Sequence, residues 1–271
     1  MLKILIIFLL PVTTIFAQGA ADESLGGHVA ASRGEWSLWR NPAGLTHTGT
    51  SAIALGVRQL PAITLLSKSA LIALTTRAGC FSTGMLAFGD EIYNEQTLSL
   101  GYAHSIGITS VGIRADALQL RIDGLGIRRT FGITIGASTF VGKRIIIGAV
   151  ARNINLPQWT AGEPLPVVLN AGLLFIPSEN FLLIAEIEKN TDFNPTIKGA
   201  FEYSFAKKFF IRTGFNLHPH AAFGGLGFKL WHLGFDYALR WGYHTGYAQQ
   251  LSVSLKSIKK IHRDDHPLPI R

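Results

Sequence analysis

Short stretches in which apolar and polar side chains alternate follow one another through most of this sequence. Near the C-terminus, one face of an extended segment would carry Leu233, Phe235 and Tyr237. Its opposite face would carry Asp236 and Arg240. A period of two residues is typical of strands with one apolar and one polar face. Beyond the first seventeen residues, no apolar run reaches the roughly 20 residues that a membrane-spanning helix needs. The chain is therefore predicted to be built from strands.

The composition indicates where the apolar strand faces lie. Hydrophobic residues make up 48% of the chain, and its mean hydropathy is +0.28. Charged residues make up 15%, against about 25% in typical soluble domains. A chain this apolar without a spanning helix is expected to place its strands against lipid. The sequence thus predicts an all-β fold, a transmembrane antiparallel β-barrel surrounded by outer-membrane lipid.

About fourteen strands are predicted from the alternation and from the turn residues between them. The joints between them alternate in length. Tight joints are expected near Ala78, Ser105, Gly142, Ser178, Ala206 and Trp231, with longer polar joints between them. Outer-membrane barrels have short periplasmic turns and longer external loops. An even number of strands then places both ends of the barrel on the periplasmic side.

The first seventeen residues have the features of a secretory signal peptide. Lys3 supplies a positive charge, an uncharged apolar core follows, and Ala17 provides a small residue at a cleavage site. The alternative is a membrane-anchoring helix, but the apolar run is shorter than about 20 residues and Pro11 interrupts it. We therefore expect residues 1–17 to be removed on export to a Gram-negative outer membrane.

The remaining sequence divides into an N-terminal segment at 18–50, the barrel at 51–256 and a polar periplasmic tail at 257–271. The N-terminal segment is rich in glycine and lacks alternation. Within it, Ser32 and Glu35 fit a capping box that would start a short helix.

A hard turn is predicted after that helix, at Asn41, Pro42, Ala43 and Gly44. Proline disfavours helix at the residue before it, and glycine permits a turn. The first strand would then follow.

Charged residues occur at the middle of several strands, on the polar faces. Such charges are costly in lipid and acceptable inside a barrel. The predicted lumen charges are Arg114, Asp116, Glu186, Lys198, Glu202, Arg212, Asp236 and Arg240. Two interpretations stay open for them, salt-bridged packing that fills the lumen and a path for a substrate.

Aromatic residues lie near the predicted strand ends, as in the interfacial belts of membrane proteins. They are Tyr93, Tyr102, Phe140, Trp159, Phe209, Trp231, Trp241, Tyr243 and Tyr247.

Two parts of the N-terminal segment, 25–31 and 36–45, resemble the N-terminal signature of the PorV/PorQ family of outer-membrane barrels. That family is related to the long-chain fatty acid transporter barrels, which share an Asn-Pro-Ala element. Further segments that resemble the family lie at 93–96, 185–189, 210–214, 223–229 and 235–236. The resemblance implies fourteen strands around a small N-terminal helical plug, with Asn41, Pro42, Ala43 and Gly44 as the plug motif.

No catalytic constellation is apparent in the sequence, so we expect neither an enzyme nor a cofactor. His218 and His220 flank a proline, where an exposed turn is a simpler interpretation than a metal site, and we expect no metal. The single cysteine, Cys80, excludes an intramolecular disulfide. The net charge is +8, but the basic residues are scattered, so we expect no nucleic acid partner. The basic cluster at 256–263 suits an anionic membrane surface.

Two functions follow as alternatives. The first is a plugged conduit for hydrophobic or small amphipathic compounds, which would leave through a gap in the wall. The second is a non-conducting barrel that partners a type IX-like secretion or surface-assembly machine, as the family resemblance also suggests.

Overall fold

The computed structural model describes residues 17–60, 65–160, 162–243 and 246–257. The predicted signal peptide, apart from Ala17, and the predicted tail, apart from Ser257, lie outside these ranges. In the described part, fourteen strands form one closed antiparallel barrel in which each strand pairs with its sequence neighbours and β1 pairs with β14. This confirms the predicted fold class and strand number. The strands are β1 (Ala52–Leu60), β2 (Leu65–Thr76), β3 (Gly79–Gly89), β4 (Tyr93–Ile106), β5 (Thr109–Ile122), β6 (Gly126–Val141), β7 (Ile145–Arg152), β8 (Val168–Ser178), β9 (Phe181–Asn190), β10 (Thr196–Phe205), β11 (Phe209–Asn216), β12 (Ala221–Leu230), β13 (Leu233–Gly242) and β14 (Gly246–Lys256).

The two ends of the barrel differ in the length of their connections. At the tight-turn end, short connections join β2 to β3, β4 to β5, and so on to β12 and β13. The other end, which we call the loop end, includes the connection 153–167 between β7 and β8. Ser257 donates its N–H to the carbonyl of Ser51 at 2.7 Å, so the barrel begins and ends together at the tight-turn end.

The wall alternates between an apolar outer face and a mixed inner face. In β2, buried and exposed residues alternate along nearly the whole strand, and the outward side chains include Leu66, Ile72 and Leu74. Several predicted belt aromatics also point outward, among them Trp231, Trp241, Tyr243 and Tyr247. The belt interpretation is wrong for Tyr93 and Phe140, which are buried inside. Trp159 also departs from it, because it packs against a buried apolar cluster.

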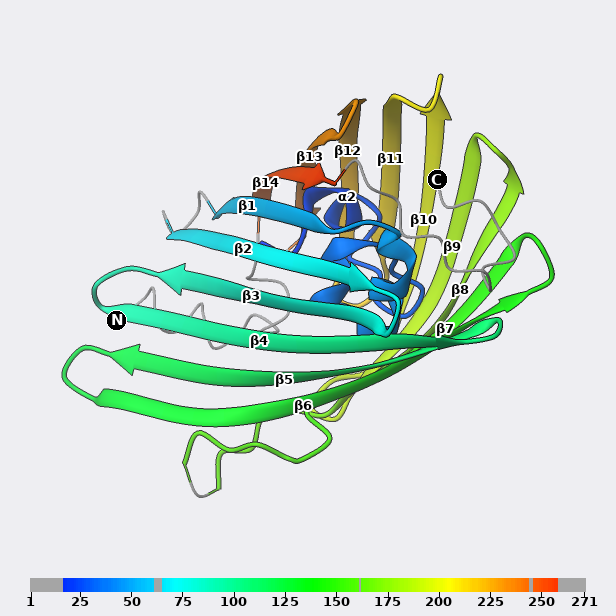
Figure 1. Ribbon diagram of the computed structural model, residues 1–271. Coiled ribbons are helices and arrows are strands. Elements are labelled where there is room, and N and C mark those ends of the chain that lie inside the picture. The colour runs from blue at the N-terminus through cyan, green and yellow to red at the C-terminus, as the bar shows by residue number, and fades with distance from the viewer. Residues whose placement is uncertain (1–16, 61–64, 161, 244–245, 258–271) are drawn as a thin grey trace.

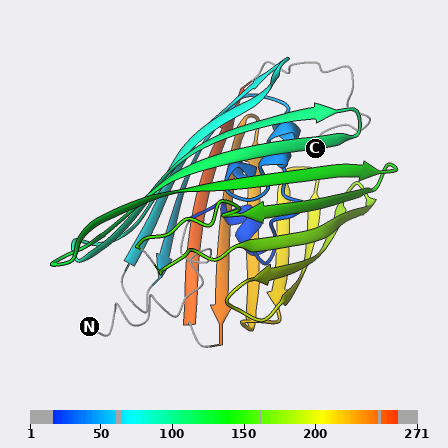
Figure 2. The ribbon, with the colours of Figure 1, turned by 90° about the horizontal axis from the view of Figure 1, so that it is seen from below.

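The N-terminal segment lies within the barrel (Figures 1 and 2) and forms three short helices: α2 (Ala20–Ser24), η2 (Glu35–Leu38) and η3 (Pro42–Thr48). The capping-box prediction is wrong, because η2 begins after Gly34 without a side-chain cap. Ser32 contacts Ser37 and Asp22 instead. In the described residues, no helix is long and apolar enough to span a membrane.

Asn41 and Pro42 start a helix where only a hard turn was predicted. Asn41 has extended backbone angles and caps η3, and Pro42 occupies the first helical position. Proline suits that position because its missing N–H would have no partner there.

Candidate functional site

The lumen contains the N-terminal segment, which we call the plug (residues 18–50). Nearly every residue in it is buried, including the large side chains of Trp36, Leu38 and Trp39. Its helices contact strands on both sides of the barrel: α2 lies against β12 to β14, and η3 against β4 to β6. A solute moving along the axis would therefore meet the plug.

Asn41 joins the plug to the wall. Its Nδ2 donates to the carbonyl oxygens of Ala30, Ala137 and Ala149 at 2.6, 3.1 and 3.3 Å. Its Oδ1 accepts the N–H of Ala43 at 3.1 Å. Because Ala137 and Ala149 face each other across β6 and β7, one side chain holds two plug segments against two neighbouring strands.

Glycines let the plug approach this part of the wall. A Cβ atom added to Gly112 would collide with the backbone of Pro42 and Ala43. One added to Gly136 would collide with the Asn41 side chain, and one on Gly148 with the carbonyl oxygen of Ala30. Gly112 and Gly136 are paired across β5 and β6. The wall is thus one backbone thick where the plug motif touches it.

The predicted lumen charges lie on the inner face of the barrel, and all of them except Arg240 are paired or hydrogen-bonded there. Arg114 bonds Asp116 at 2.8 Å and donates to the carbonyl of Leu38 in the plug at 2.9 Å. Arg212 bridges Glu202 and Asp236 at 2.7 and 2.6 Å.

Arg240 lies over the ring of Phe223. The ion pairs and hydrogen bonds of Arg114 and Arg212 replace the water that these buried charges lose.

Glu186 and Lys198 belong to a larger network that holds the plug. Glu186 accepts the N–H groups of Val29 and Ala30 at 2.7 and 2.6 Å. Lys198 lies 3.3 Å from Glu186 and 2.9 Å from Glu188.

Several members of the polar lumen were missed from the sequence. Asp22 and Glu23 of α2 pair with Arg40, and Glu23 also lies 3.1 Å from Arg58 of β1. Glu188 could have been found, because it lies two residues after Glu186 and so shares its face. Asp22, Glu23 and Arg40 gave no such signal, because the plug has no strand period.

The inner face also has an apolar part near the loop end. There Leu60, Leu65, Phe88, Tyr93 and Leu120 belong to one buried cluster. This cluster continues into the plug through Trp36, Leu38, Trp39 and Leu45. Trp159, from the connection 153–167, packs against it.

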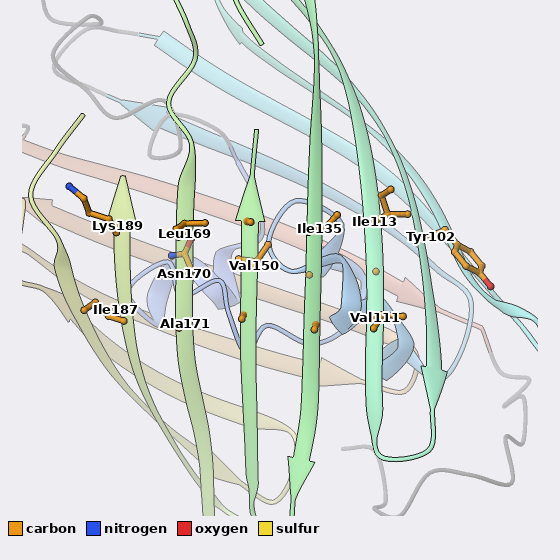
Figure 3. A pocket seen from close by; sticks show the side chains of 15 residues that line it. Tyr102, Val111, Ile113, Ile135, Val150, Leu169, Asn170, Ala171, Ile187 and Lys189 are labelled. Carbon is orange, nitrogen blue, oxygen red and sulfur yellow. The ribbon is translucent and has the colours of Figure 1, made fainter. Parts of the chain in front are cut away.

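An apolar groove of 820 Å³ lies on the barrel wall across β4 to β9. Figure 3 shows its lining with the plug helices behind the strands. Large outward side chains such as Ile113, Ile135 and Leu169 surround small outward ones such as Ala149 and Ala171 there. The groove therefore lies on the other side of the wall from the contact made by Asn41.

The loop end of β7 adjoins this groove, and a connection closes the wall there. β7 pairs with β6 only from Thr134 to Val141, so 126–133 of β6 extends past it. The Asn155 side chain bonds to the backbone of this extension: it accepts the N–H of Ile133 at 2.8 Å and donates to the carbonyl of Phe131 at 2.8 Å. A connection, and not a strand, covers this edge of β6.

Two buried plug groups have opposite pKa shifts. Burial raises the pKa of Asp22 to about 6, although Arg40 opposes the shift. Burial also lowers the pKa of His28 well below 6.5, and Arg40 and Lys198 add to that shift. Glu23 keeps a lowered pKa because Arg58, Arg240 and Arg40 outweigh its burial.

These shifts predict two pH effects on plug docking that oppose each other. Asp22 binds a proton more tightly when docked, so its contribution weakens docking as pH rises from about 4 to about 6. His28 binds a proton less tightly when docked, so its contribution weakens docking as pH falls below 6.5. Above about pH 5, where Glu23 stays ionised in both states, we expect Asp22→Asn to leave a plug that loosens on acidification and His28→Gln one that tightens. Hydrogen exchange of plug amides, corrected for intrinsic rates, measures both. Identical pH profiles in the two variants would contradict the assignment.

Fold and site together define a closed fourteen-stranded barrel whose lumen contains its own N-terminal segment. Solved structures with this fold include the CymD monoaromatic hydrocarbon channel, with a TM-score of 0.70 and 13% identity over 91% of this chain and 99% of that one. The toluene transporter TbuX of Ralstonia pickettii matches with a TM-score of 0.63 and 14% identity, over 90% and 98%. The toluene transporter TodX of Pseudomonas putida matches with 0.63 and 10%, over 89% and 96%.

No family model matches the sequence, and no curated protein matches it significantly. In the described residues, no group of three or more His, Cys, Asp or Glu side chains is arranged to hold a metal ion.

Proposed function

We propose that this protein is a plugged conduit of a Gram-negative outer membrane that passes small hydrophobic molecules. The observation that carries the proposal is the apolar cluster that leads from the loop end to the plug through Leu60, Phe88 and Leu120. An apolar solute gains free energy on leaving water for such a surface. The apolar outer face suits lipid, and the predicted signal peptide suits export.

The likeness to barrels described as monoaromatic hydrocarbon channels and toluene transporters supports this proposal. Membership of the PorV/PorQ family, and with it a secretion or surface-assembly role, rests on the sequence resemblance alone. Crosslinking in intact outer membranes, followed by purification of the barrel, tests that alternative. Reproducible recovery of a secretion component would favour it.

The exit that we infer is lateral, at the loop end of the seam between β6 and β7. The plug obstructs the axis, whereas the groove outside this seam is apolar and open to lipid. Behind it, Gly112 and Gly136 place no side chain between the wall and the plug motif. A shift of the plug motif and of the connection held by Asn155 would join the cluster inside to the groove outside.

Filling the groove tests this exit. Ala149 and Ala171 face each other across β7 and β8 and point outward. We expect Ala149→Phe with Ala171→Phe to lower uptake of radiolabelled toluene about tenfold in cells lacking other channels, because the rings occupy the groove. The matched control places phenylalanine at Ala70 and Ala222, which point outward on β2 and β12 away from the groove.

Equal amounts of folded barrel, judged by heat-modifiable migration on gels, are required for the comparison. Uptake reduced equally in both double variants would overturn the lateral exit and leave the conduit standing. Uptake no higher with the unsubstituted protein than in cells without it would overturn the conduit.

A further inference from the structure

A second cavity, of 680 Å³, lies at the tight-turn end of the barrel. The plug forms one side of it, through residues such as His28, Arg33 and Trp36. The turn between β6 and β7 and the ends of β8 to β14 form the rest. This vestibule is separate from the outer groove, and the proposed conduit makes no use of it. Its volume falls within the roughly 300–1,000 Å³ of small-molecule sites.

One wall of the vestibule is a continuous apolar row. Phe140 pairs with Ile146 across β6 and β7, Ile146 with Leu174 across β7 and β8, and Leu174 with Ile184 across β8 and β9. These residues belong to one buried cluster, and Phe140, Leu174 and Ile184 line the cavity. The row can receive an apolar body several carbons long.

Cations outnumber carboxylates in the lining. The cations are Arg33, Lys143, Arg144, Lys207, Arg212, Lys229 and Lys256, and the carboxylates are Asp22, Glu35, Glu179, Glu202 and Asp236. All five carboxylates already have cationic partners: Asp22 pairs with Arg40, Glu35 with Lys256, Glu179 with Lys207, and Glu202 and Asp236 with Arg212. The lining therefore has an excess of positive charge.

Two of these cations lie close to one end of the apolar row. Lys143 and Arg144 form the turn that follows Phe140, and the Arg144 carbonyl accepts the N–H of Ile176 at 2.8 Å. In the part of the chain that the structure describes, neither Lys143 nor Arg144 has a carboxylate within salt-bridge distance. Both residues line the cavity, and a guanidinium and an ammonium are groups that bind carboxylates.

We propose that the vestibule binds an amphipathic monoanion, an aromatic or medium-chain carboxylate. Its carboxylate lies between Lys143 and Arg144, and its apolar body lies on the row from Phe140 to Ile184. A neutral hydrocarbon of the same size gains nothing from the two cations. A small inorganic anion gains nothing from the row. An organic cation is repelled by the excess of positive charge.

The test uses the full-length barrel in nanodiscs of zwitterionic lipid, with empty nanodiscs subtracted. Octanoate, octan-1-ol and acetate are titrated by calorimetry. We expect one octanoate to bind per barrel, at least tenfold more tightly than octan-1-ol or acetate. The double variant Lys143→Gln with Arg144→Gln is expected to weaken octanoate binding about tenfold and leave the affinity for octan-1-ol unchanged. A matched control, Arg77→Gln with Lys208→Gln, removes the same charge from exposed turn residues outside the cavity lining and should bind like the parent.

Three results would overturn the proposal. The first is equal octanoate affinity in the parent and in the Lys143/Arg144 double variant. The second is acetate binding as tight as octanoate, which would show that the apolar row has no part. The third comes from nanodiscs containing phosphatidylglycerol: loss of octanoate binding there would identify a lipid headgroup as the occupant. None of these results depends on hydrocarbon uptake, so the proposed conduit is tested separately.

Discussion

Gly148→Ala is expected to displace the plug and raise the time-averaged conductance of the barrel about tenfold or more. The added Cβ would overlap the carbonyl oxygen of Ala30, which also accepts the Asn41 bond. Both the plug segment and the strand are backbone here, so neither can move aside by changing a rotamer. Overpacking typically costs about 1–3 kcal/mol, which shifts the docked-to-undocked ratio about 5- to 150-fold. Planar-bilayer recordings measure the conductance, and hydrogen exchange of the plug amides measures how much of the plug is undocked.

The matched control is Gly224→Ala on β12. No atom lies within 4 Å of a Cβ added at Gly224, so the backbone change is the same and the clash is absent. This variant should conduct and exchange like the parent protein. If Gly148→Ala keeps a closed barrel with protected plug amides, the plug does not dock through this contact.

The sequence was sufficient to predict the barrel because the period of a strand is local. Apolar residues at every second position, such as Leu251, Val253 and Leu255, identify an outward face without knowledge of the partner strand. The same alternation along the strand identified Glu186 and Arg212 as residues that point inward. Their placement on the inner face therefore followed from strand period alone.

The plug could not be predicted in the same way. Several of its residues are positioned by contacts with strands more than a hundred residues away, such as Asn41 with Ala149 and Val29 with Glu186. A capping box at Ser32 was a sound local prediction, but tertiary contacts with Asp22 and Ser37 engaged that hydroxyl. Likewise, no local signal distinguishes Gly148, where the plug touches the wall, from Gly224, where nothing does.

Glu186→Gln is expected to loosen the plug by about 3–5 kcal/mol, although glutamine has nearly the same shape. The Glu186 side chain is fully buried, and donors surround both of its oxygens. One oxygen accepts two plug N–H groups, from Val29 and Ala30. The other accepts from Asn170 at 2.8 Å and lies 3.3 Å from Lys198. In either orientation, the glutamine NH₂ would face donors and leave them without an acceptor.

Glu179→Gln provides the matched control, because it makes the same substitution in an exposed pair with Lys207. Exposed pairs contribute about 0–1 kcal/mol, so this variant should keep the parent's stability. Urea titration of the folded barrel in lipid, together with exchange at 27–31, separates loss of the plug from loss of the barrel. We expect Glu186→Gln to expose the plug amides at urea concentrations at which the strands stay protected. If strands and plug lose protection together, Glu186 stabilises the barrel as a whole and the plug is not an independently docked element.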